Sequence, residues 1–567
     1  MSRRLAGAVL GALLLAGCST VPSSSPMVQI TQEPARAPEA VGLEPLEPQE
    51  GAAPEEVVRG FISAAASTAP RHPVARQYLT AEAAESWSDE SGITVIAPDY
   101  ATVTQSSGTV VVTADRVGDL DQRGVFTVGE TEPPYTASFA LEDVDGEWRI
   151  SNPPAGLVMA QPDFERLYDQ RALYFVDPTL QRVVPDPRYL IEGDAQPTAL
   201  VERLLAGPSP TLGPGVLNLL TEASLVRSVS ASGQSVTVDL SGVADLAPSE
   251  LSVLSAQLVW TLDQLPGSPS VELLVDSEPL ALEGVPLLQS VEDWSTFDPE
   301  AAPVGAVGHY IEAGALRSTD GQPAPGPAGQ GVYGLQGAAV SADLRTGELS
   351  AMVGTALRDS RTALLVGAYG GELTERLSGR SLTAPTVAAT RSEFWTVRDG
   401  TEVVRVPADG TPQPVDATSL EVLGPASALQ LSPDGVRVAV VVGGELYVGT
   451  VVRAEDAPVT LRDLRPVAPS LGGVSDVAWS AAGRLLVLAT EGPGEGVVPY
   501  SLGVDGWGVT AVGTAGLPGQ PSSIAAAPSQ QPLVSADGSM WQLSGGTWLT
   551  LVRGEEPRRG TEPFFPA

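Results

Sequence analysis

A repeat of 43 to 48 residues in the second half of the chain restricts its fold more than any other feature. Strand-like phrases recur there, and Val340, Ala388, Leu431, Trp479 and Ala526 occupy equivalent positions, separated by 48, 43, 48 and 47 residues. Runs rich in Gly, Asp and Pro separate the phrases, as is typical of turns between strands. A period of this length with four short strands per repeat predicts a β-propeller.

Five repeats are visible, so we predict an all-β propeller of about five blades over residues 291–567, with a connector at its start. A sixth, degenerate blade is the alternative count. The strand in "AVGHYIEAGALRS" is expected to pair with the last repeat, which would close the ring and remove exposed sheet edges. A single β-sandwich is the competing fold, but it would not explain the period.

Residues 54–160 combine helices with a run of strands. "PEEVVRGFISAAAS" has Pro54 at its start, two acids in its first turn and apolar residues at helical spacing. Strand-like runs follow, and Asp145-Gly146 separates two of them like a hairpin turn. Helices followed by a meander predict an α+β domain with the helices on one face of an antiparallel sheet. The order looks like the NTF2-like fold.

Residues 161–290 predict a second α+β domain. "QPTALVERLLAGPSP" is expected to form a helix, and "APSELSVLSAQLVWTLDQLP" a long helix with Ser249 as N-cap and Pro266 as its stop. Strand-like runs alternate with these helices. The phrases "ALVERLLAGPS", "VTVDLS" and "LSAQLVWTLDQLP" resemble the GerMN domain. That resemblance implies a binding role and carries over no catalytic residue.

The N-terminus has the layout of a secretory signal peptide. Arg3 and Arg4 form a positive n-region, and residues 5–15 form an apolar h-region that is too short to span about 30 Å of hydrocarbon. Small residues precede Cys18, the single cysteine of the chain. A plain signal peptide with an incidental cysteine, or a very short membrane anchor, would explain these features as well.

Leu15, Ala16, Gly17 and Cys18 also resemble the bacterial lipobox. This resemblance implies that residues 1–17 are a lipoprotein signal peptide, cleaved between Gly17 and Cys18. It further implies that Cys18 is the lipid attachment residue and carries an S-diacylglycerol and an N-acyl group. Two or more acyl chains give stable membrane attachment where one does not.

Residues 18–53 are rich in Pro, Ser, Glu and Ala and predict a disordered tether. No other stretch has the length and apolar character of a transmembrane helix. We therefore expect the protein on the extracytoplasmic face of the cell membrane, held to the lipid bilayer by its Cys18 anchor.

Charge and composition disfavour several kinds of partner. The formal net charge is −36, so phosphate backbones would be repelled and nucleic acid is not expected as a partner. One cysteine cannot form an internal disulfide or a cysteine-rich zinc site. His72 and His309 are far apart in the sequence, so we predict no metal site and no cofactor.

No catalytic residues are predicted, because the chain contains no GxSxG, HExxH or Walker motif. Acidic pairs are abundant, at Glu55-Glu56, Glu142-Asp143 and Glu555-Glu556, and no spacing singles one out as general acid and base. The repeat-region tryptophans are expected to pack the blades: Trp395, Trp479, Trp507, Trp541 and Trp548.

The ordered combination of these features resembles the LpqB family of actinobacterial lipoproteins. It comprises a lipobox, a leader domain with "DGEWRISNPPAGLVM", a GerMN-like domain, the connector "EDWSTFDP" and a propeller with "LTAPTVAATRSEFWTV". The resemblance implies a partner, the extracytoplasmic domain of the sensor histidine kinase MtrB. The MtrA–MtrB two-component system is tied to cell-wall homeostasis and division.

The leading hypothesis is therefore a non-enzymatic, membrane-anchored accessory lipoprotein that binds this kinase and modulates its signalling. The alternative is a cell-wall or glycan-binding lipoprotein. A third hypothesis is a hydrolase with carboxylates at the mouth of the propeller. A distance between two carboxylates typical of glycosidases would support it.

Overall fold

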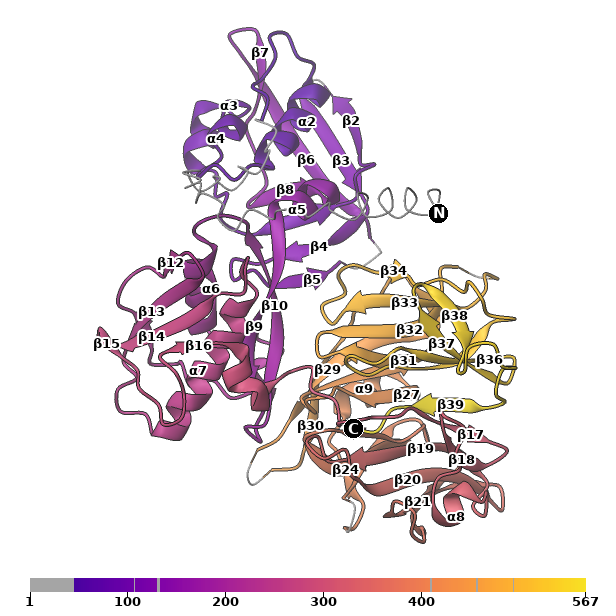
Figure 1. The fold of residues 1–567 in the computed structure, drawn as a ribbon. Helices are drawn as coiled ribbons and strands as arrows, with labels where there is room; N and C mark the ends of the chain where they lie inside the picture. The colour runs from indigo at the N-terminus through magenta and orange to yellow at the C-terminus, as the bar shows by residue number, and fades with distance from the viewer. Residues whose placement is uncertain (1–44, 107, 130–132, 408–409, 455–456, 493) are drawn as a thin grey trace, which may run out of the picture. The chain divides into compact units, whose positions relative to one another are not determined.

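The computed structural model describes residues 45–567 apart from residues 107, 130–132, 408–409, 455–456 and 493 (Figure 1). Leu15, Ala16, Gly17 and Cys18, and with them the cleavage position, lie outside the described residues. The last part of the segment expected to be a tether contacts the first domain. The Tyr78 hydroxyl donates to the Leu46 carbonyl at 2.9 Å, and the Gly51 amide donates to the Glu147 carboxylate at 3.1 Å.

The first domain is α+β, as predicted. Instead of the single antiparallel sheet expected, it has two four-stranded sheets, ordered β5-β4-β1-β8 and β2-β3-β6-β7, and β1 pairs with β8 in parallel. Its helices are α2 (Pro54–Ala65), α3 (Pro73–Gln77), α4 (Ala81–Ser86) and α5 (Gln161–Leu167). Its strands are β1 (Ile93–Ile96), β2 (Ala101–Ser106), β3 (Thr109–Ala114), β4 (Arg116–Leu120), β5 (Phe126–Val128), β6 (Tyr135–Val144), β7 (Glu147–Ile150) and β8 (Leu157–Ala160).

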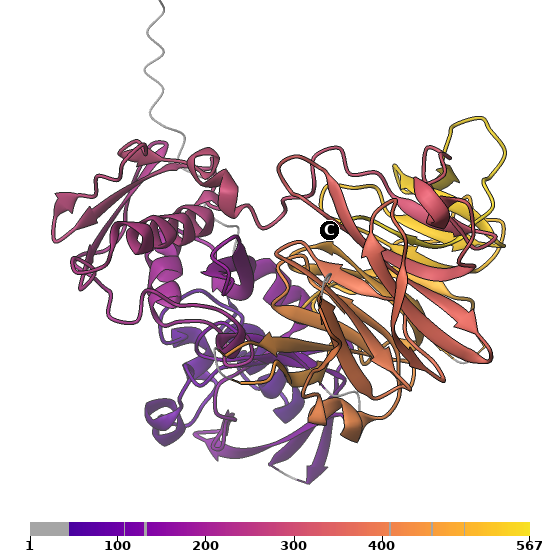
Figure 2. The same ribbon diagram turned by 90° about the horizontal axis from the view of Figure 1, so that it is seen from below.

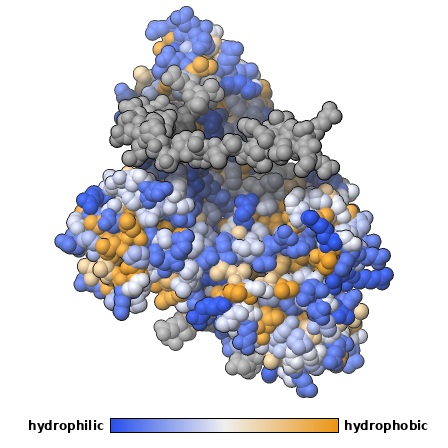
Figure 3. All heavy atoms as spheres, in the orientation of Figure 1, coloured by the Kyte–Doolittle hydropathy of each residue, from blue (hydrophilic) through white to orange (hydrophobic). Residues whose placement is uncertain are grey.

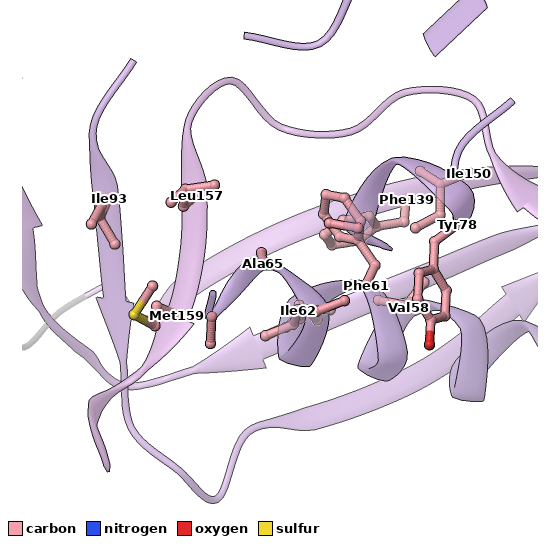
Figure 4. Close-up of a cluster of buried hydrophobic side chains, with 14 of the residues drawn as sticks. Val58, Phe61, Ile62, Ala65, Tyr78, Ile93, Phe139, Ile150, Leu157 and Met159 are labelled. Atoms are coloured by element: carbon pink, nitrogen blue, oxygen red, sulfur yellow. The ribbon is translucent and has the colours of Figure 1, made fainter. Parts of the chain in front are cut away.

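Helix α2 forms where its start signals predict it. Pro54 is the first helical residue, and the Glu56 carboxylate accepts the Ala53 amide at 2.9 Å. Its apolar face packs into the core of the domain, where Phe61 and Ile62 lie near Phe139 (Figure 4). Val58 belongs to the same buried cluster. This burial, and not helix propensity, holds the helix in place.

The second domain is also α+β. Its hairpin consists of β9 (Tyr168–Val176) and β10 (Val183–Ile191). Its sheet has the order β11-β13-β14-β15, with β12 on β13 and β16 on β14. Because β13 and β14 are parallel, helix α7 crosses between them. The elements are α6 (Gln196–Leu205), η1 (Gly213–Gly215), β11 (Ser224–Leu225), β12 (Ser230–Ser232), β13 (Ser235–Ser241), α7 (Pro248–Asp263), β14 (Ser270–Val275), β15 (Glu278–Pro279), β16 (Leu288–Gln289) and η2 (Val291–Phe297).

The N-cap prediction for the long helix is wrong. Helix α7 begins at Pro248, so Ser249 lies inside its first turn and Ala247 is the N-cap. The Glu250 carboxylate accepts the Ala247 amide at 2.8 Å and satisfies that donor instead. The helix ends at Asp263, three residues before Pro266, as the stop signal predicts.

The C-terminal region contains five four-stranded antiparallel sheets in chain order (Figure 1 and Figure 2). Their strands are β19 (Leu335–Ala342), β20 (Leu349–Arg358), β21 (Arg361–Ala368), β22 (Thr374–Gly379), β23 (Thr386–Ala388), β24 (Arg391–Arg398), β25 (Glu402–Pro407), β26 (Gln413–Pro414), β27 (Ala426–Leu431), β28 (Arg437–Val442), β29 (Glu445–Val452), β30 (Thr460–Pro466), β31 (Gly472–Ala481), β32 (Arg484–Thr490), β33 (Val498–Gly503), β34 (Thr510–Ala511), β35 (Pro521–Ala525), β36 (Leu533–Ala536), β37 (Ser539–Ser544) and β38 (Thr547–Thr550).

A sixth sheet has three strands, β17 (His309–Glu312), β18 (Ala315–Ser318) and β39 (Thr561–Phe564). The segment in "AVGHYIEAGALRS" therefore pairs with a strand that follows the last repeat. The first strands of the five larger sheets contact one another in sequence, and β39 contacts both β35 and β19. The Ala342 amide also donates to the Ala567 carbonyl at 2.8 Å. Two short helices, α8 (Gly326–Gly329) and α9 (Thr418–Leu423), complete the region.

The predicted fold class is confirmed: two α+β domains precede a strand-rich region of the propeller type. The repeat positions Val340, Ala388, Leu431 and Trp479 each lie in the first strand of one four-stranded sheet, and Ala526 directly follows β35. The period found in the sequence is thus the spacing between successive sheets.

Candidate functional site

The two histidines lie in different domains. His72 precedes helix α3, and its Nδ1 lies 2.8 Å from the Asp89 carboxylate. His309 lies in strand β17 and is 2% exposed. Across the described ranges, no three His, Cys, Asp or Glu side chains come close enough to hold a metal ion together.

His309 is held as a neutral ring. Its Nδ1 lies 2.8 Å from the Val307 carbonyl, and its Nε2 lies 3.1 Å from the Tyr369 hydroxyl. Because a carbonyl only accepts, Nδ1 carries the proton and Nε2 accepts from Tyr369. The ring stacks on Phe564 at 5.4 Å and so links β17 to the C-terminal strand.

We expect acidification to destabilise the propeller through His309. Burial lowers the pKa of His309 from 6.5 to about 4. The unfolded chain therefore takes up a proton below about pH 6.5, whereas the folded chain does so only near pH 4. Stability falls as the pH falls between these values, by about 2 kcal/mol at pH 5. The free energy of unfolding of wild type and of His309→Gln, each measured at pH 7 and at pH 5, tests this expected loss of stability. An equal loss in both proteins would assign the pH dependence to other groups.

Acidic residues of the pairs named in the sequence analysis make structural contacts. The Glu55 carboxylate accepts the Thr104 amide and hydroxyl, each at 2.9 Å, while Glu56 caps helix α2. Asp143 accepts the Gly146 amide at 2.7 Å in the β6–β7 turn. Glu555 forms an exposed ion pair with Arg558 at 3.7 Å. None of these pairs lies where a general acid and base would face a common substrate.

One of the five repeat-region tryptophans does not pack a blade. Trp395, Trp479 and Trp548 are buried in their sheets, and Trp541 packs partly buried against the cluster that contains Trp548, as expected. Trp507, in the turn between β33 and β34, instead lies among Phe126, Phe164 and Tyr189. The Trp507 ring centroid is 4.9 Å from that of Phe126 and 5.1 Å from that of Phe164. Rings from all three domains thus form one aromatic junction.

A buried polar contact lies beside the aromatic junction. The Tyr189 hydroxyl donates to Asp505 Oδ2 at 2.9 Å, and the Gln170 amide donates to the same oxygen at 3.2 Å. Burial raises the pKa of Asp505, while the hydrogen bonds of Trp507 and Tyr189 oppose the rise. This contact fixes the rotation of the Tyr189 ring within the junction.

The first two domains also share a backbone contact. The Tyr189 amide donates to the Gly124 carbonyl at 2.9 Å, and Gly124 has φ +75°. A Cβ on residue 124 would come within 2.9 Å of the Tyr189 carbonyl oxygen, so only glycine fits here. Arg123 donates to the carbonyls of Ala206, Gly207 and Pro208 at the C-terminal end of helix α6, at 2.8 to 2.9 Å. A cation there complements the helix dipole.

The second domain contacts the propeller through buried arginines. Arg437 of β28 donates to the Pro185 carbonyl at 2.6 Å, and Arg182 donates to the Ala301 carbonyl at 2.5 Å. Arg182 and Arg437 are 1% and 5% exposed. Thr450 adds a bond to the Thr211 carbonyl at 2.8 Å. Residues 45–567 therefore form one contiguous body rather than separate domains on loose linkers.

The sequence signal for this junction is weak. Trp507 lies in "GVDGWGV", a turn sequence in which a bulky apolar residue would otherwise be exposed. A tryptophan in a turn sequence is a hint of a contact outside its own sheet, but it does not identify the partner. None of the helices in the described part of the chain combines the length and apolar composition that crossing a bilayer requires.

Three family models match successive parts of the chain. Residues 47–165 match "Lipoprotein LpqB, N-terminal domain", residues 172–281 match "Sporulation and spore germination", and residues 314–566 match "Lipoprotein LpqB beta-propeller domain". The matched segments coincide in order with the three domains described above.

Whole-length relatives carry the same name. "Lipoprotein LpqB" of Mycolicibacterium smegmatis is 33% identical over 518 residues, which cover 87% of each chain. The protein of that name in Rhodococcus jostii is 30% identical over 515 residues, covering 86% of this chain and 85% of the other. Among solved structures, the tandem GerMN domains of the sporulation protein GerM from Bacillus subtilis are similar at 18% identity and a TM-score of 0.17, over 22% of this chain and 47% of that chain.

Proposed function

The chain belongs to the LpqB lipoprotein family, and we propose from this premise that it is a non-enzymatic accessory lipoprotein of a sensor kinase. Its partner would be the extracytoplasmic domain of the histidine kinase MtrB, the partner that the family resemblance implies. Binding would bias the signalling state of the kinase and so affect cell-wall homeostasis and division. The observation that supports this proposal is the ordered match of all three domains along the chain.

The membrane anchor would supply much of the effective affinity. A lipid-anchored Cys18 would hold the protein on the extracytoplasmic face of the cell membrane, the face on which the sensor domain lies. Confinement of both partners to one surface raises their effective concentration without any new contact. Binding would shift the equilibrium between the two signalling states of the kinase only by the difference in the protein's affinity for those states.

The contiguous body of residues 45–567 suits a regulator better than a flexible string of domains would. The contacts of Trp507, Arg437 and Arg123 fix the domains against one another. A pre-organised surface loses less conformational entropy on binding. Hydrophobic and hydrophilic residues are interspersed on the face shown in Figure 3, and the apolar fraction of a non-obligate interface is close to that of the rest of a protein surface.

Cysteine-directed crosslinking in native membranes tests this proposal. A lipidated Cys18 has no free thiol, so an introduced cysteine would be the single reactive thiol of the chain. Suitable positions, one per domain, are Val103, Leu288 and Val422, which are 56%, 54% and 83% exposed. We expect a crosslink to MtrB from at least one of them. Val440→Cys, at a position with 0% exposure, is the matched negative control.

Kinase output completes the test. Phosphorylation of MtrA in membrane vesicles should differ between vesicles with and without this protein. Unchanged output together with no crosslink from any of the three positions would contradict the proposal. Binding of the chain to isolated cell-wall material, without any crosslink to the kinase, would support the wall-binding alternative instead.

A further inference from the structure

A cavity of about 120 Å³ lies among the first strands of the propeller sheets. Its walls come from β19, β23, β27, β31, β35 and β39, from the connector at residues 301–303 and from the C-terminal residues. A cavity of this volume has room for about four water molecules or a body close to the size of a benzene ring. Its lining includes the polar residues Asp476, Ser523 and Glu562 on the neighbouring strands β31, β35 and β39, together with Thr386 and Gln430.

Asp476 lies in β31 and is held at the cavity wall by two backbone amides. Its Oδ1 accepts the Val477 amide at 2.9 Å, and its Oδ2 accepts the Ile524 amide at 2.8 Å. Burial raises the pKa of Asp476 to about 7, and the negative charge of Glu562 adds to this rise. No arginine pairs with Asp476 among the described residues. Both oxygens keep a free lone pair.

Glu562 lies in β39 at a break in the pairing with β17. His309 pairs with Phe564 and Ile311 with Thr561, so two residues of β39 oppose Tyr310. This is a β-bulge, a feature that redirects side chains and is frequent beside functional sites. Glu562 has φ +50°, a conformation that glycine adopts without strain but glutamate does not. The fold therefore places a glutamate here at a cost in backbone energy.

Among the described residues, no hydrogen-bond donor or cation balances the negative charge of the Glu562 carboxylate. Burial raises its pKa, and in the part of the chain that the structure describes it forms no hydrogen bond or ion pair. The Glu562 side chain is half-buried, and an unpaired, partly desolvated carboxylate is unfavourable unless a cation or proton accompanies it. A strained backbone and an uncompensated acid at one position are together difficult to explain as packing alone.

Ser523, in β35, provides a third and independent observation. It is 4% exposed, and its Oγ has no hydrogen-bond partner among the described residues. A buried hydroxyl without a partner costs free energy in the empty protein. Because Ser523 lies between Asp476 and Glu562 in strand order, a donor bound in the cavity would satisfy it.

A comparison of the repeats shows that polar residues are exceptional at the positions of Asp476 and Ser523. Asp476 and Ser523 each lie three positions before a repeat position, Trp479 and Ala526. The three other repeats have small or apolar residues at the same place, Gly337, Pro385 and Ala428. Blade packing therefore does not require a polar residue here, and two successive blades have one.

We propose that this cavity binds a small organic cation, a primary ammonium attached to an apolar body. The three N–H donors of an ammonium group match the three acceptors Asp476, Ser523 and Glu562. The other walls include Trp479, Ile524 and Phe564, which suit an apolar body, and an indole face also attracts cations. Trp479 is fixed by its Nε1 bond to the Gln430 carbonyl at 3.1 Å.

The same geometry bears on the hydrolase hypothesis. Two carboxylates do lie at the centre of the propeller, but the cavity accepts a body close to the size of one six-membered ring, which is smaller than a disaccharide. Both Asp476 oxygens already accept backbone amides. The arrangement fits retention of a small cation better than cleavage of a glycan.

Calorimetry with benzylammonium and its neutral analogue benzyl alcohol tests the proposal on the full chain in detergent. We expect saturable binding of benzylammonium and binding of benzyl alcohol that is weaker by about tenfold or more. Glu562→Gln should weaken benzylammonium binding by about tenfold, and Ser523→Ala by about threefold. Glu421→Gln, at an exposed position of the same region, is the matched control and should bind as wild type does.

Three results would overturn the proposal: no saturable binding below about 10 mM, equal binding of the alcohol, or unchanged binding by Glu562→Gln. Thermal unfolding of each variant checks that it is folded. Glu562→Asn serves as a second variant, because asparagine tolerates positive φ better than other non-glycine residues. The proposal does not depend on kinase binding, so the crosslinking result does not decide it.

Discussion

Replacing Cys18 by serine is expected to move the protein from the membrane fraction to the soluble fraction. The lipobox hypothesis assigns to the Cys18 sulfur the diacylglycerol that holds the chain, and a serine hydroxyl does not take its place. Stable attachment needs two hydrophobic signals, and an acylated cysteine supplies them. No helix within the described ranges is long and apolar enough to cross a membrane. The expected change is therefore nearly complete.

Fractionation followed by immunoblotting measures this change, and the mass of the mature N-terminus reports cleavage. Ser19→Ala is the matched control, because it changes the neighbouring residue and leaves Leu15, Ala16, Gly17 and Cys18 intact. It should remain membrane-bound. A Cys18→Ser protein that stays with the membranes would reject the lipobox interpretation and favour a short uncleaved anchor.

The propeller was the part of the fold that the sequence predicts best, because its repeats are local. Leu431 and Trp479 recur in phase with the sheets since each sheet is built from one contiguous segment. The sixth sheet is different, because β17 pairs with β39 at the opposite end of the region. A three-stranded sheet from two distant segments leaves no periodic signal in the sequence. The pairing of its strands is expected only because an open array would leave exposed sheet edges.

Local sequence signals predict a structure less well where neighbouring residues offer competing signals. Ser249 is a good N-cap by type, but Pro248 fits the first helical position and Glu250 bonds back to the Ala247 amide, so the helix starts one residue earlier. The sequence predicts blade packing for Trp507, because tryptophans usually pack the core of their own domain. Its partners Phe126 and Tyr189 lie in other domains, and only tertiary structure brings them together.

The cavity residues could be found in the sequence only after the repeats are aligned. Asp476 and Ser523 then appear as polar residues at a position that is otherwise small or apolar. Glu562 leaves no comparable signal, because it lies beyond the last repeat and reaches the cavity through the β-bulge with β17. The abundance of acids in the chain hides such a residue, since no spacing distinguishes it.

Replacing Asp186 by alanine is expected to destabilise the second domain by about 3–5 kcal/mol. Asp186 and Arg188 form an ion pair at 2.9 Å and are 3% and 1% exposed. Asp186 also accepts the Ser209 amide at 2.6 Å and the Ser209 hydroxyl at 2.9 Å. Its loss leaves the Arg188 charge buried without its carboxylate, which costs far more than an exposed pair contributes. Asp163→Ala breaks the half-exposed pair with Arg166 and is the matched control, with an expected loss below about 1 kcal/mol.

Amide hydrogen exchange in β9 and β10 measures the effect where it arises, because exchange reports the local free energy of opening. Exchange there should accelerate strongly in Asp186→Ala and little in Asp163→Ala. Burial alone would raise the pKa of Asp186, but the Arg188 charge and the bonds from Arg188 and Ser209 lower it below its ordinary value. The contribution is thus fully present above about pH 4 and is lost as the pH falls through the lower folded pKa. Equal exchange in the two variants at neutral pH would mean that the buried pair adds nothing beyond a surface pair.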